Sequence, residues 1–197
     1  ESKENGISIN LGPGGNLHRN ILCGRHPEYY SEDPILTGTL MAYQARGLEE
    51  NGVIATYKHL IANNMEFERK SAHGIIDENT LRDLYLRVFD KAFSLYKPGC
   101  VMTSYNPVNG IYPCENSALL NDLLRGEWGF DGFVMTDWGS YDTADSIRSV
   151  CAGTNLLTPG SKKHFRMILK AVKRNEISKA ALQHSVKQIV KVLVRCI

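Results

Sequence analysis

Segments typical of buried strands alternate along the chain with segments of helical periodicity. Short runs of apolar and β-branched residues, bounded by glycine, proline or polar residues, predict strands buried on both faces. Such runs lie at residues 8–11, 53–57, 100–104, 133–136 and 154–157. The alternation with helices predicts an α/β fold in which parallel strands are joined by right-handed crossovers.

The helices are predicted from capping residues and apolar spacing. Asp33 followed by Pro34 predicts the start of a helix that ends at Asn51. In this helix we expect four residues to face the core: Leu36, Leu40, Ala45 and Leu48. Asp77 precedes the most periodic helix, whose apolar residues from Leu81 to Phe93 recur every three or four positions. Further helices are expected near residues 116–128, 143–152, 164–175 and 179–194, the last of them capped by Ser178.

Five strands are too few for a closed eight-stranded barrel, which takes about 250 residues. The chain is therefore predicted to be part of a barrel or an open doubly wound sheet. The dinucleotide-binding form of the open sheet requires Gly-x-Gly-x-x-Gly between strand and helix, and the sequence contains no such run. The turn Gly12-Pro13-Gly14-Gly15 also lacks the Lys-Ser/Thr of a phosphate-binding loop.

Composition narrows the classes of partner. The 197 residues are 43% hydrophobic and carry a formal net charge of +2, which gives no electrostatic reason to expect a nucleic acid or an anionic membrane. No apolar run approaches the roughly 20 residues of a membrane span, and no signal-peptide pattern follows Glu1. Five cysteines without a Cys-x-x-Cys pair predict reduced thiols, a cytoplasmic location and no metal site: Cys23, Cys100, Cys114, Cys151 and Cys196.

Asp137 is the first candidate for catalysis, because it follows the strand at 133–136 directly. The carboxyl ends of parallel strands form the rim where α/β barrels assemble their chemistry. Trp138, the next residue, offers a flat apolar wall of the kind that stacks on a sugar. An Asp in this position can instead simply cap the following helix.

Three more candidates lie at the ends of other predicted strands. Lys58 and His59 are either a surface Lys beside a core-bonded His or two hydrogen-bond donors for substrate hydroxyls. Lys58 could also form a Schiff base with a carbonyl substrate. Tyr105 can cap the core or project its phenol into a site, whereas Met102 is expected to fill core.

Arg25 and Arg69 lie in two polar loops expected above the barrel. Acidic residues surround both, with Glu28 near the first and Glu66 near the second. Structural ion pairs are therefore the default interpretation of the two arginines.

Taken in order, several runs of the sequence form a pattern that covers nearly the whole chain. They are Asn16-Leu17-His18-Arg19, Cys23-Gly24-Arg25, residues 28–34, residues 58–64 with Glu66 and Arg69, residues 101–106 with Asn109-Gly110, residues 124–130, and Thr136-Asp137-Trp138. This pattern resembles the barrel domain of glycoside hydrolase family 3. The resemblance implies that residues 1–197 are part of a (β/α)8 TIM-like barrel, roughly its last five or six strands with their helices. It also implies a barrel truncated on its N-terminal side, without the second domain that carries the acid/base residue.

The resemblance also implies roles for individual residues. Asp137 matches the catalytic nucleophile of the family. Residues that match the binders of sugar hydroxyls are Arg25, Lys58, His59 and Arg69, and those that match the lining of the same subsite are Met102, Tyr105 and Trp138. The implied activity is that of a retaining β-glucosidase-like enzyme, without metal or organic cofactor, acting on a β-glucoside or oligosaccharide. Its partner would be the missing domain, in the same or a companion chain.

Retaining chemistry requires an ionised Asp137, so we expect neighbouring donors such as Lys58 and Arg69 to hold its pKa down. It also needs a carboxylic acid about 5 Å away, and none of the carboxylates in the chain is a convincing candidate. A non-catalytic glycan-binding fragment is therefore the competing hypothesis, and a Schiff-base lyase using Lys58 is a third.

Two features separate the chain from common family patterns. The usual Gly-x-Asp run stands here as Gly153-Thr154-Asn155, and the usual Met-Pro-Gly as Thr158-Pro159-Gly160. We expect the change to Asn155 to affect a structural bond rather than catalysis. After the Lys-His pair, residues 60–63 lack the Pro-Gly-His-Gly of the N-acetylglucosaminidase branch, which favours the glucosidase and xylosidase branch.

Overall fold

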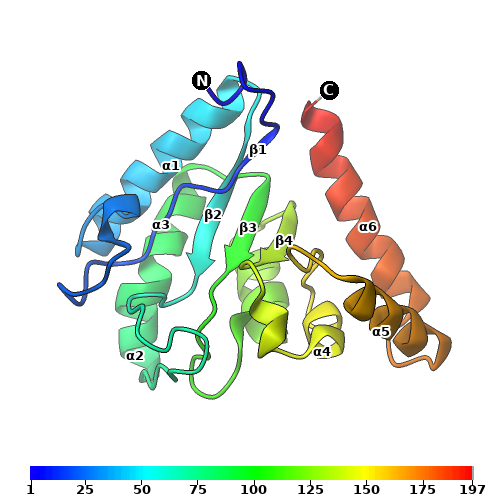
Figure 1. The fold of residues 1–197 in the computed structure, drawn as a ribbon. Helices are drawn as coiled ribbons and strands as arrows, with labels where there is room; N and C mark the ends of the chain where they lie inside the picture. The colour runs from blue at the N-terminus through cyan, green and yellow to red at the C-terminus, as the bar shows by residue number, and fades with distance from the viewer. Residues whose placement is uncertain (197) are drawn as a thin grey trace.

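Four parallel strands form the centre of the protein, in a computed structural model that describes residues 1–196 (Figure 1). The strands lie side by side in chain order: β1 (Ile9–Asn10), β2 (Ile54–Leu60), β3 (Cys100–Thr103) and β4 (Phe133–Thr136). Each neighbouring pair is parallel. The fold is thus the predicted α/β class, an open section of barrel wall with helical crossovers.

The fifth predicted strand, at residues 154–157, is wrong as a strand. The structure has only a single parallel bridge there, between Met135 and Leu156. Its backbone does bond to β4, with the Leu156 N–H donating to Val134 O at 3.1 Å. The Val134 N–H, however, donates to the side-chain Oδ1 of Asn155 at 2.7 Å, so a side chain interrupts the ladder.

β2 is longer than the sequence predicts, and this matters for the site. The predicted strand ends at Tyr57, before the first charged residue, whereas β2 continues to Leu60. Its pairing with β3 resumes at Leu60, opposite Thr103, after an irregularity that begins at Tyr57. Lys58 and His59 therefore lie near the end of a paired strand rather than in a loop.

The helices begin close to where capping residues place them. They are α1 (Pro34–Glu50), the run of α2 (Glu78–Thr80), η2 (Leu81–Leu86) and α3 (Arg87–Leu95), η4 (Ala118–Glu127), α4 (Ser146–Cys151), α5 (Lys162–Lys173) and α6 (Lys179–Leu193). Single turns occur at η1 (His26–Glu28), η3 (Pro113–Glu115), η5 (Ser140–Asp142) and η6 (Val194–Cys196). The predicted caps Asp33, Asp77 and Ser178 each accept a bond from a first-turn backbone N–H. The helix predicted near 143–152 starts later, where Asp145 caps α4.

Two of the four residues predicted to face inward from α1 are exposed. Leu36 and Leu40 are 49% and 41% exposed, while Ala45 is fully buried. The buried face of α1 also carries Gly38, where a Cβ would lie 2.4 Å from Val88 O of α3. Because α1 and α3 approach so closely, small residues of α1 make the contact, and Leu36 and Leu40 lie on its exposed face.

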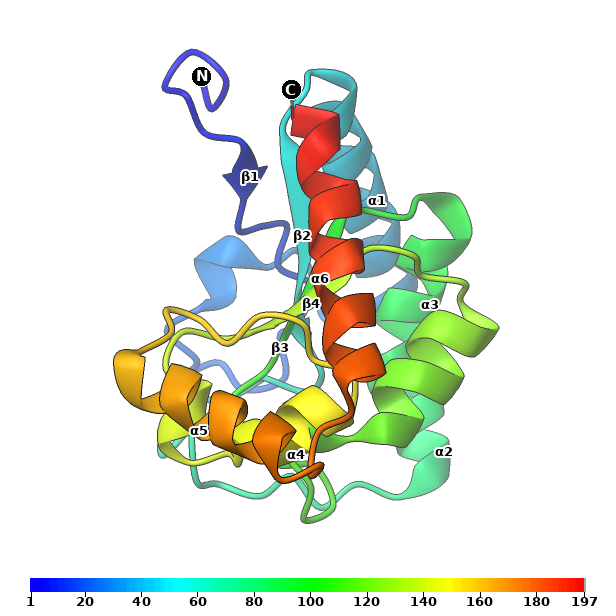
Figure 2. The ribbon, with the colours of Figure 1, turned by 90° about the vertical axis from the view of Figure 1, so that its right-hand side faces the viewer.

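The core has two layers, one on each face of the sheet. The larger layer packs β2, β3 and β4 against α1, α3 and η4. The smaller one joins strand side chains that point the other way to Val192 of α6: Ile54, Cys100, Met102, Phe133 and Met135. Figure 2 shows α6 in front of the sheet, on the side away from α1 and α3. Both termini lie at the end of the sheet opposite the carboxyl ends of its strands (Figure 1).

The structure also describes most of the cysteines and the helices that could be compared with the length of a membrane span. Cys23, Cys100, Cys114 and Cys151 are thiols rather than disulfides, and the side chain of Cys196 lies outside the described part of the structure. Over residues 1–196, none of the helices combines the length and the apolar character needed to cross a bilayer.

Candidate active site

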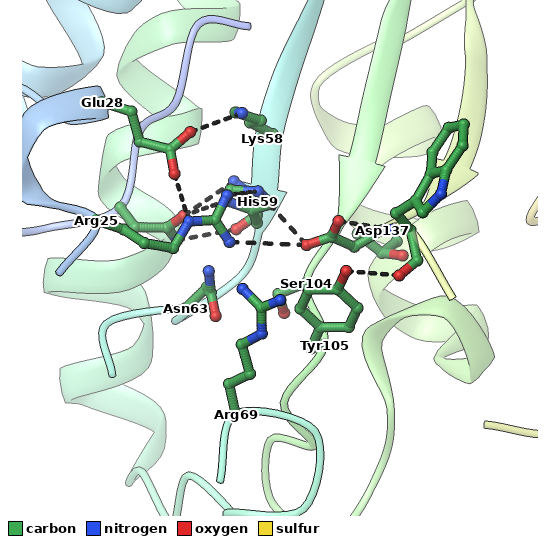
Figure 3. Close-up of polar contacts among 12 residues, drawn as sticks. Arg25, Glu28, Lys58, His59, Asn63, Arg69, Ser104, Tyr105 and Asp137 are labelled. Carbon is green, nitrogen blue, oxygen red and sulfur yellow. Dashed lines mark hydrogen bonds and ion pairs between the residues drawn. The ribbon is translucent and has the colours of Figure 1, made fainter. Parts of the chain in front are cut away.

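The candidate residues converge where β2, β3 and β4 end (Figure 3). β2 contributes Lys58 and His59, the segment after β3 contributes Tyr105, and Asp137 follows β4 directly. Arg25 and Arg69 reach the same place from two loops. Parallel strands deliver their carboxyl ends to one edge, which explains why residues far apart in sequence meet here.

Asp137 lies at the centre of this cluster and is only 6% exposed. Its Oδ1 accepts a hydrogen bond from the Trp138 N–H at 2.6 Å. Its Oδ2 lies 3.5 Å from Nε2 of His59 and 3.9 Å from a terminal nitrogen of Arg25, too far for a hydrogen bond in either case. Among the described residues this oxygen has no hydrogen-bond partner, so a buried acceptor without a bond lies beside His59 and Arg25.

The pKa of Asp137 is raised, contrary to the expectation from sequence. Burial is the largest cause, and the Trp138 N–H, Arg25, Tyr105 and Arg69 oppose it by favouring the carboxylate. Lys58 is instead paired with Glu28, its ammonium 2.7 Å from Oε2 of that residue. The expectation failed because it counted the donors but not the loss of water around the carboxyl group.

Glu28 organises the cationic side of the site. It accepts from Nε of Arg25 with one oxygen and from Lys58 with the other. Although burial alone would raise the pKa of Glu28, the bonds from Arg25 and Lys58 lower it. The ion-pair interpretation of Arg25 is thus correct, and the same guanidinium also faces Asp137.

Arg69, like Arg25, forms an ion pair with a glutamate and also contacts another residue of the site. It bonds to Oε2 of Glu66 at 2.8 Å, as its acid-rich surroundings predict. Its guanidinium also lies over the ring of Tyr105, 4.6 Å from the ring centre. Tyr105 in turn donates its hydroxyl to Trp138 O at 2.6 Å, and burial with the nearby Asp137 raises its pKa to about 12.

The last two predicted residues differ in exposure. Trp138 is 57% exposed, and its backbone N–H bonds to Asp137. Met102 is 3% exposed and belongs to the smaller core layer with Met135, as the core-filling interpretation expects. The described contacts do not bring Met102 to the polar cluster.

Sequence reasoning missed three polar residues near His59. Asn16 and Tyr29 contact its ring, and Asn63 donates to the Tyr29 hydroxyl at 3.2 Å. In the sequence Asn16 is only the first residue of the run Asn16-Leu17-His18-Arg19, and nothing in its spacing marks it as a partner of His59. All three are at most 6% exposed. Burial of polar residues in glycine-rich and polar loops next to β2 is a signal that only the structure provides.

Cavities and metal-binding groups elsewhere in the described structure offer no second candidate for an active site. A groove of ≈ 750 Å³ between α5 and α6 is lined mainly by apolar side chains such as Phe165, Val186 and Val190. Within residues 1–196, no group of three His, Cys, Asp or Glu side chains is placed to hold a metal ion.

Comparison with known proteins decides the family. The profile of the glycosyl hydrolase family 3 N-terminal domain matches residues 1–192. The chain belongs to this family. The resemblance drawn from the sequence motifs is therefore confirmed.

Relatives of this family 3 chain include thermostable beta-glucosidase B of Acetivibrio thermocellus, 41% identical over 98% of the chain and 25% of that protein. A beta-glucosidase of Rhizobium radiobacter is 41% identical over 99% of the chain and 24% of its own length. Beta-glucosidase 3B of Thermotoga neapolitana, solved in complex with glucose, superposes with a TM-score of 0.94 at 40% identity, over 98% of the chain and 28% of that structure. The chain thus spans about a quarter of the length of these relatives.

Proposed function

We propose that this chain is the nucleophile-bearing part of a retaining β-glucosidase that hydrolyses terminal, non-reducing β-D-glucosyl residues. The observation that carries the proposal is the buried Oδ2 of Asp137 in a chain of glycosyl hydrolase family 3. Among residues 1–196 this oxygen has no hydrogen-bond partner, and it lies beside Arg25 and His59. Relatives that are about 40% identical carry the name beta-glucosidase, which supports the choice of a glucoside as substrate.

The proposed reaction is a double displacement. Oδ2 of Asp137 attacks the anomeric carbon, the bond to the leaving oxygen breaks, and that oxygen takes a proton from a carboxylic acid. Water then attacks the same carbon, loses a proton to the resulting carboxylate, and releases the sugar from Asp137 with retained configuration. Only the ionised form of Asp137 can attack, so its raised pKa sets the lower pH limit of the first step.

We assign the sugar-binding roles to the surrounding donors. Arg25, Lys58, His59 and Arg69 would hold the hydroxyl groups of the glucosyl unit. Tyr105 and Trp138 would line the subsite, whereas Met102 lies in the smaller core layer. The exposed indole of Trp138 can stack on the apolar face of a sugar ring. No metal or organic cofactor is required for this chemistry.

The proton donor is proposed to come from outside the described residues. Retention requires two carboxyl groups about 5 Å apart. The carboxylates Glu28, Glu66 and Glu115 are already engaged in ion pairs with Lys58 or with arginines, which argues against an acid role for them. Because the relatives are about four times as long as this chain, a further domain in the same or a companion chain is the proposed source.

The competing functions make different predictions. A non-catalytic glycan-binding module is favoured by the absence of an available acid among residues 1–196, and it predicts binding without bond cleavage. A lyase acting through Lys58 predicts that borohydride traps a carbonyl substrate on that residue. The ion pair with Glu28 already engages Nζ of Lys58, the atom that would have to attack the carbonyl, which argues against this chemistry.

Release of 2,4-dinitrophenolate from the corresponding β-glucoside tests the proposal, because this leaving group departs without a proton donor. We expect a burst approaching one equivalent per chain, and no burst from Asp137→Asn. Binding of the glucoside without release of dinitrophenolate would support the glycan-binding module instead. Borohydride-dependent labelling of Lys58 would support the lyase.

A further inference from the structure

His59 is almost completely buried, and its ring touches four polar side chains. It is 1% exposed, and burial, with Arg25, Lys58 and Arg69 nearby, puts its pKa well below the ordinary value. The ring is therefore neutral, and only one of its nitrogens carries a proton. Which nitrogen it is decides whether the ring offers a donor or an acceptor to the site.

Asn16 supplies the contact that settles this question. Its Nδ2 donates to His59 O at 2.9 Å, and its Oδ1 accepts from the His59 N–H at 3.0 Å. These two backbone bonds fix the orientation of the amide, since a flipped amide would set donor against donor and acceptor against acceptor. The same Oδ1 lies 3.1 Å from Nδ1 of the His59 ring.

An oxygen that can only accept requires a proton on Nδ1. Arg25 requires the same arrangement from the other side, because its terminal nitrogen can only donate and lies 2.9 Å from Nε2. The opposite tautomer would improve only the 3.5 Å approach of Nε2 to Asp137, and it would oppose the two shorter contacts. Tyr29, whose hydroxyl lies 3.2 Å from Nδ1, is compatible with either tautomer.

We propose that Asn16 is a positioning residue of the site, which fixes His59 as the Nδ1–H tautomer and so presents an unprotonated Nε2 to Arg25 and to the bound sugar. This inference deepens the proposed function and rests on it for the role of the sugar. The Nε2 lone pair holds the Arg25 guanidinium on the side of the ring where Asp137 lies. When a sugar enters, the same lone pair accepts from a hydroxyl group or continues to orient Arg25 toward one.

The tautomer can be measured without turnover. Long-range ¹H–¹⁵N correlation spectra of the chain labelled with [¹⁵N]histidine separate protonated from unprotonated ring nitrogens, and His59→Gln assigns the signal. We expect Nδ1 protonated and Nε2 unprotonated in the unmodified chain. In Asn16→Leu, which removes the acceptor at similar volume, we expect the Nε2–H tautomer to become populated. The opposite tautomer in the unmodified chain, or an unchanged tautomer in a folded Asn16→Leu variant, would overturn the inference.

Two further variants keep the test decisive if Asn16→Leu does not fold. Asn16→Asp retains an acceptor beside Nδ1 and adds a negative charge, so we expect the Nδ1–H tautomer and a higher pKa for His59. Tyr29→Phe removes the other neighbour of Nδ1, and we expect its tautomer to be that of the unmodified chain. A switch to Nε2–H in Tyr29→Phe, or an unshifted His59 titration in Asn16→Asp, would contradict the role of Asn16.

A reactivity measurement separates the two proposals. Labelling of Asp137 by 2,4-dinitrophenyl 2-deoxy-2-fluoro-β-glucoside should slow by about 10- to 100-fold in Asn16→Leu, as misplacement of a binding group does. If the unmodified chain shows the predicted tautomer but is not labelled even when the remaining domain of a full-length relative is supplied, the proposed function fails and the tautomer assignment stands. If labelling is normal in Asn16→Leu, Asn16 has no positioning role.

Discussion

Arg125 is a half-buried cation that has no carboxylate partner within residues 1–196, so its contribution to stability can be increased. Its guanidinium donates to Gly132 O at 3.0 Å, Gly153 O at 3.3 Å and Oδ1 of Asn155 at 2.9 Å. Within residues 1–196 no carboxylate lies within 4.0 Å of it, and burial lowers its pKa, with Asp131 opposing. The substitution Asn155→Asp would place a charge on an acceptor that is already in position.

The expected gain follows from the difference between two kinds of hydrogen bond. A bond between neutral groups contributes about 0.5–1.5 kcal/mol, and a bond to a charged group about 1.5–3 kcal/mol. Arg125 is charged already, so the new carboxylate would turn its bond to residue 155 into an ion pair. Desolvation of the new carboxylate offsets part of this difference, because Asn155 is half-buried. The Val134 N–H, 2.7 Å from the same oxygen, also gains a charged acceptor. We expect a net stabilisation of about 1 kcal/mol, or roughly 2–4 °C in Tm for a chain of this size.

Urea unfolding of the two proteins at several pH values provides the assay. The Arg125 guanidinium would hold the pKa of the new Asp below its usual value, so the gain is present at neutral pH and is lost as the pH falls through that lowered pKa. Asn155→Leu is the matched control, and it should destabilise the chain because it leaves Arg125 and the Val134 N–H without this acceptor. Equal stability of Asn155→Asp and the unmodified chain at neutral pH, or a gain that does not vary with pH, would refute the reasoning.

The remaining predictions concern the site and the opposite end of the sheet. Asp137→Asn should abolish the dinitrophenolate burst yet raise the free energy of unfolding at neutral pH, because the raised pKa of Asp137 means that its ionisation destabilises the folded chain. In urea titrations the extra stability of the variant should shrink as the pH falls toward 4, the ordinary pKa range of Asp. The burst rate itself should fall at a higher pH than an ordinary Asp would give, and a stopped-flow pH profile with an ordinary Asp limit would contradict this. Trp138→Ala should leave Tm within a few degrees because the indole is 57% exposed, while calorimetry should detect weaker glucoside binding, and unchanged binding would exclude the stacking role. Glu49→Ala should destabilise the chain by about 3 kcal/mol in urea unfolding. The reason is that the buried Glu49 carboxylate accepts from the Gly99 N–H at 2.6 Å and from the Tyr96 hydroxyl at 3.0 Å. A loss of stability below about 1 kcal/mol would show that water replaces these bonds.

The sequence predicts the framework of this fold well because local rules govern it. The strand at 133–136 is correct to the residue, and the Asp and Ser caps of the long helices are where short-range chemistry places them. The errors arise where tertiary contacts decide. The close approach of α1 to α3 turns Leu36 and Leu40 outward, and the side chain of Asn155 replaces a backbone acceptor beside β4.

The site is predictable to a similar degree. The rule that barrel chemistry gathers at carboxyl strand ends, together with the family motifs, selects Asp137, Lys58, His59 and Tyr105, and the structure brings them together. The direction of the Asp137 pKa could not be predicted, since it depends on how far the folded chain removes water. Asn16 was equally out of reach, because its role consists of three bonds to a residue 43 positions away.

The nucleophile assignment is the central claim, and covalent trapping tests it most directly. The chain is incubated with 2,4-dinitrophenyl 2-deoxy-2-fluoro-β-glucoside, digested and mapped by mass spectrometry, with Asp137→Asn treated in parallel. We predict one 2-fluoroglucosyl adduct, on the peptide that contains Asp137, and none in the variant. An adduct on another carboxylate, or no adduct even when the remaining domain of a full-length relative is supplied, would contradict the assignment of Asp137 as the nucleophile.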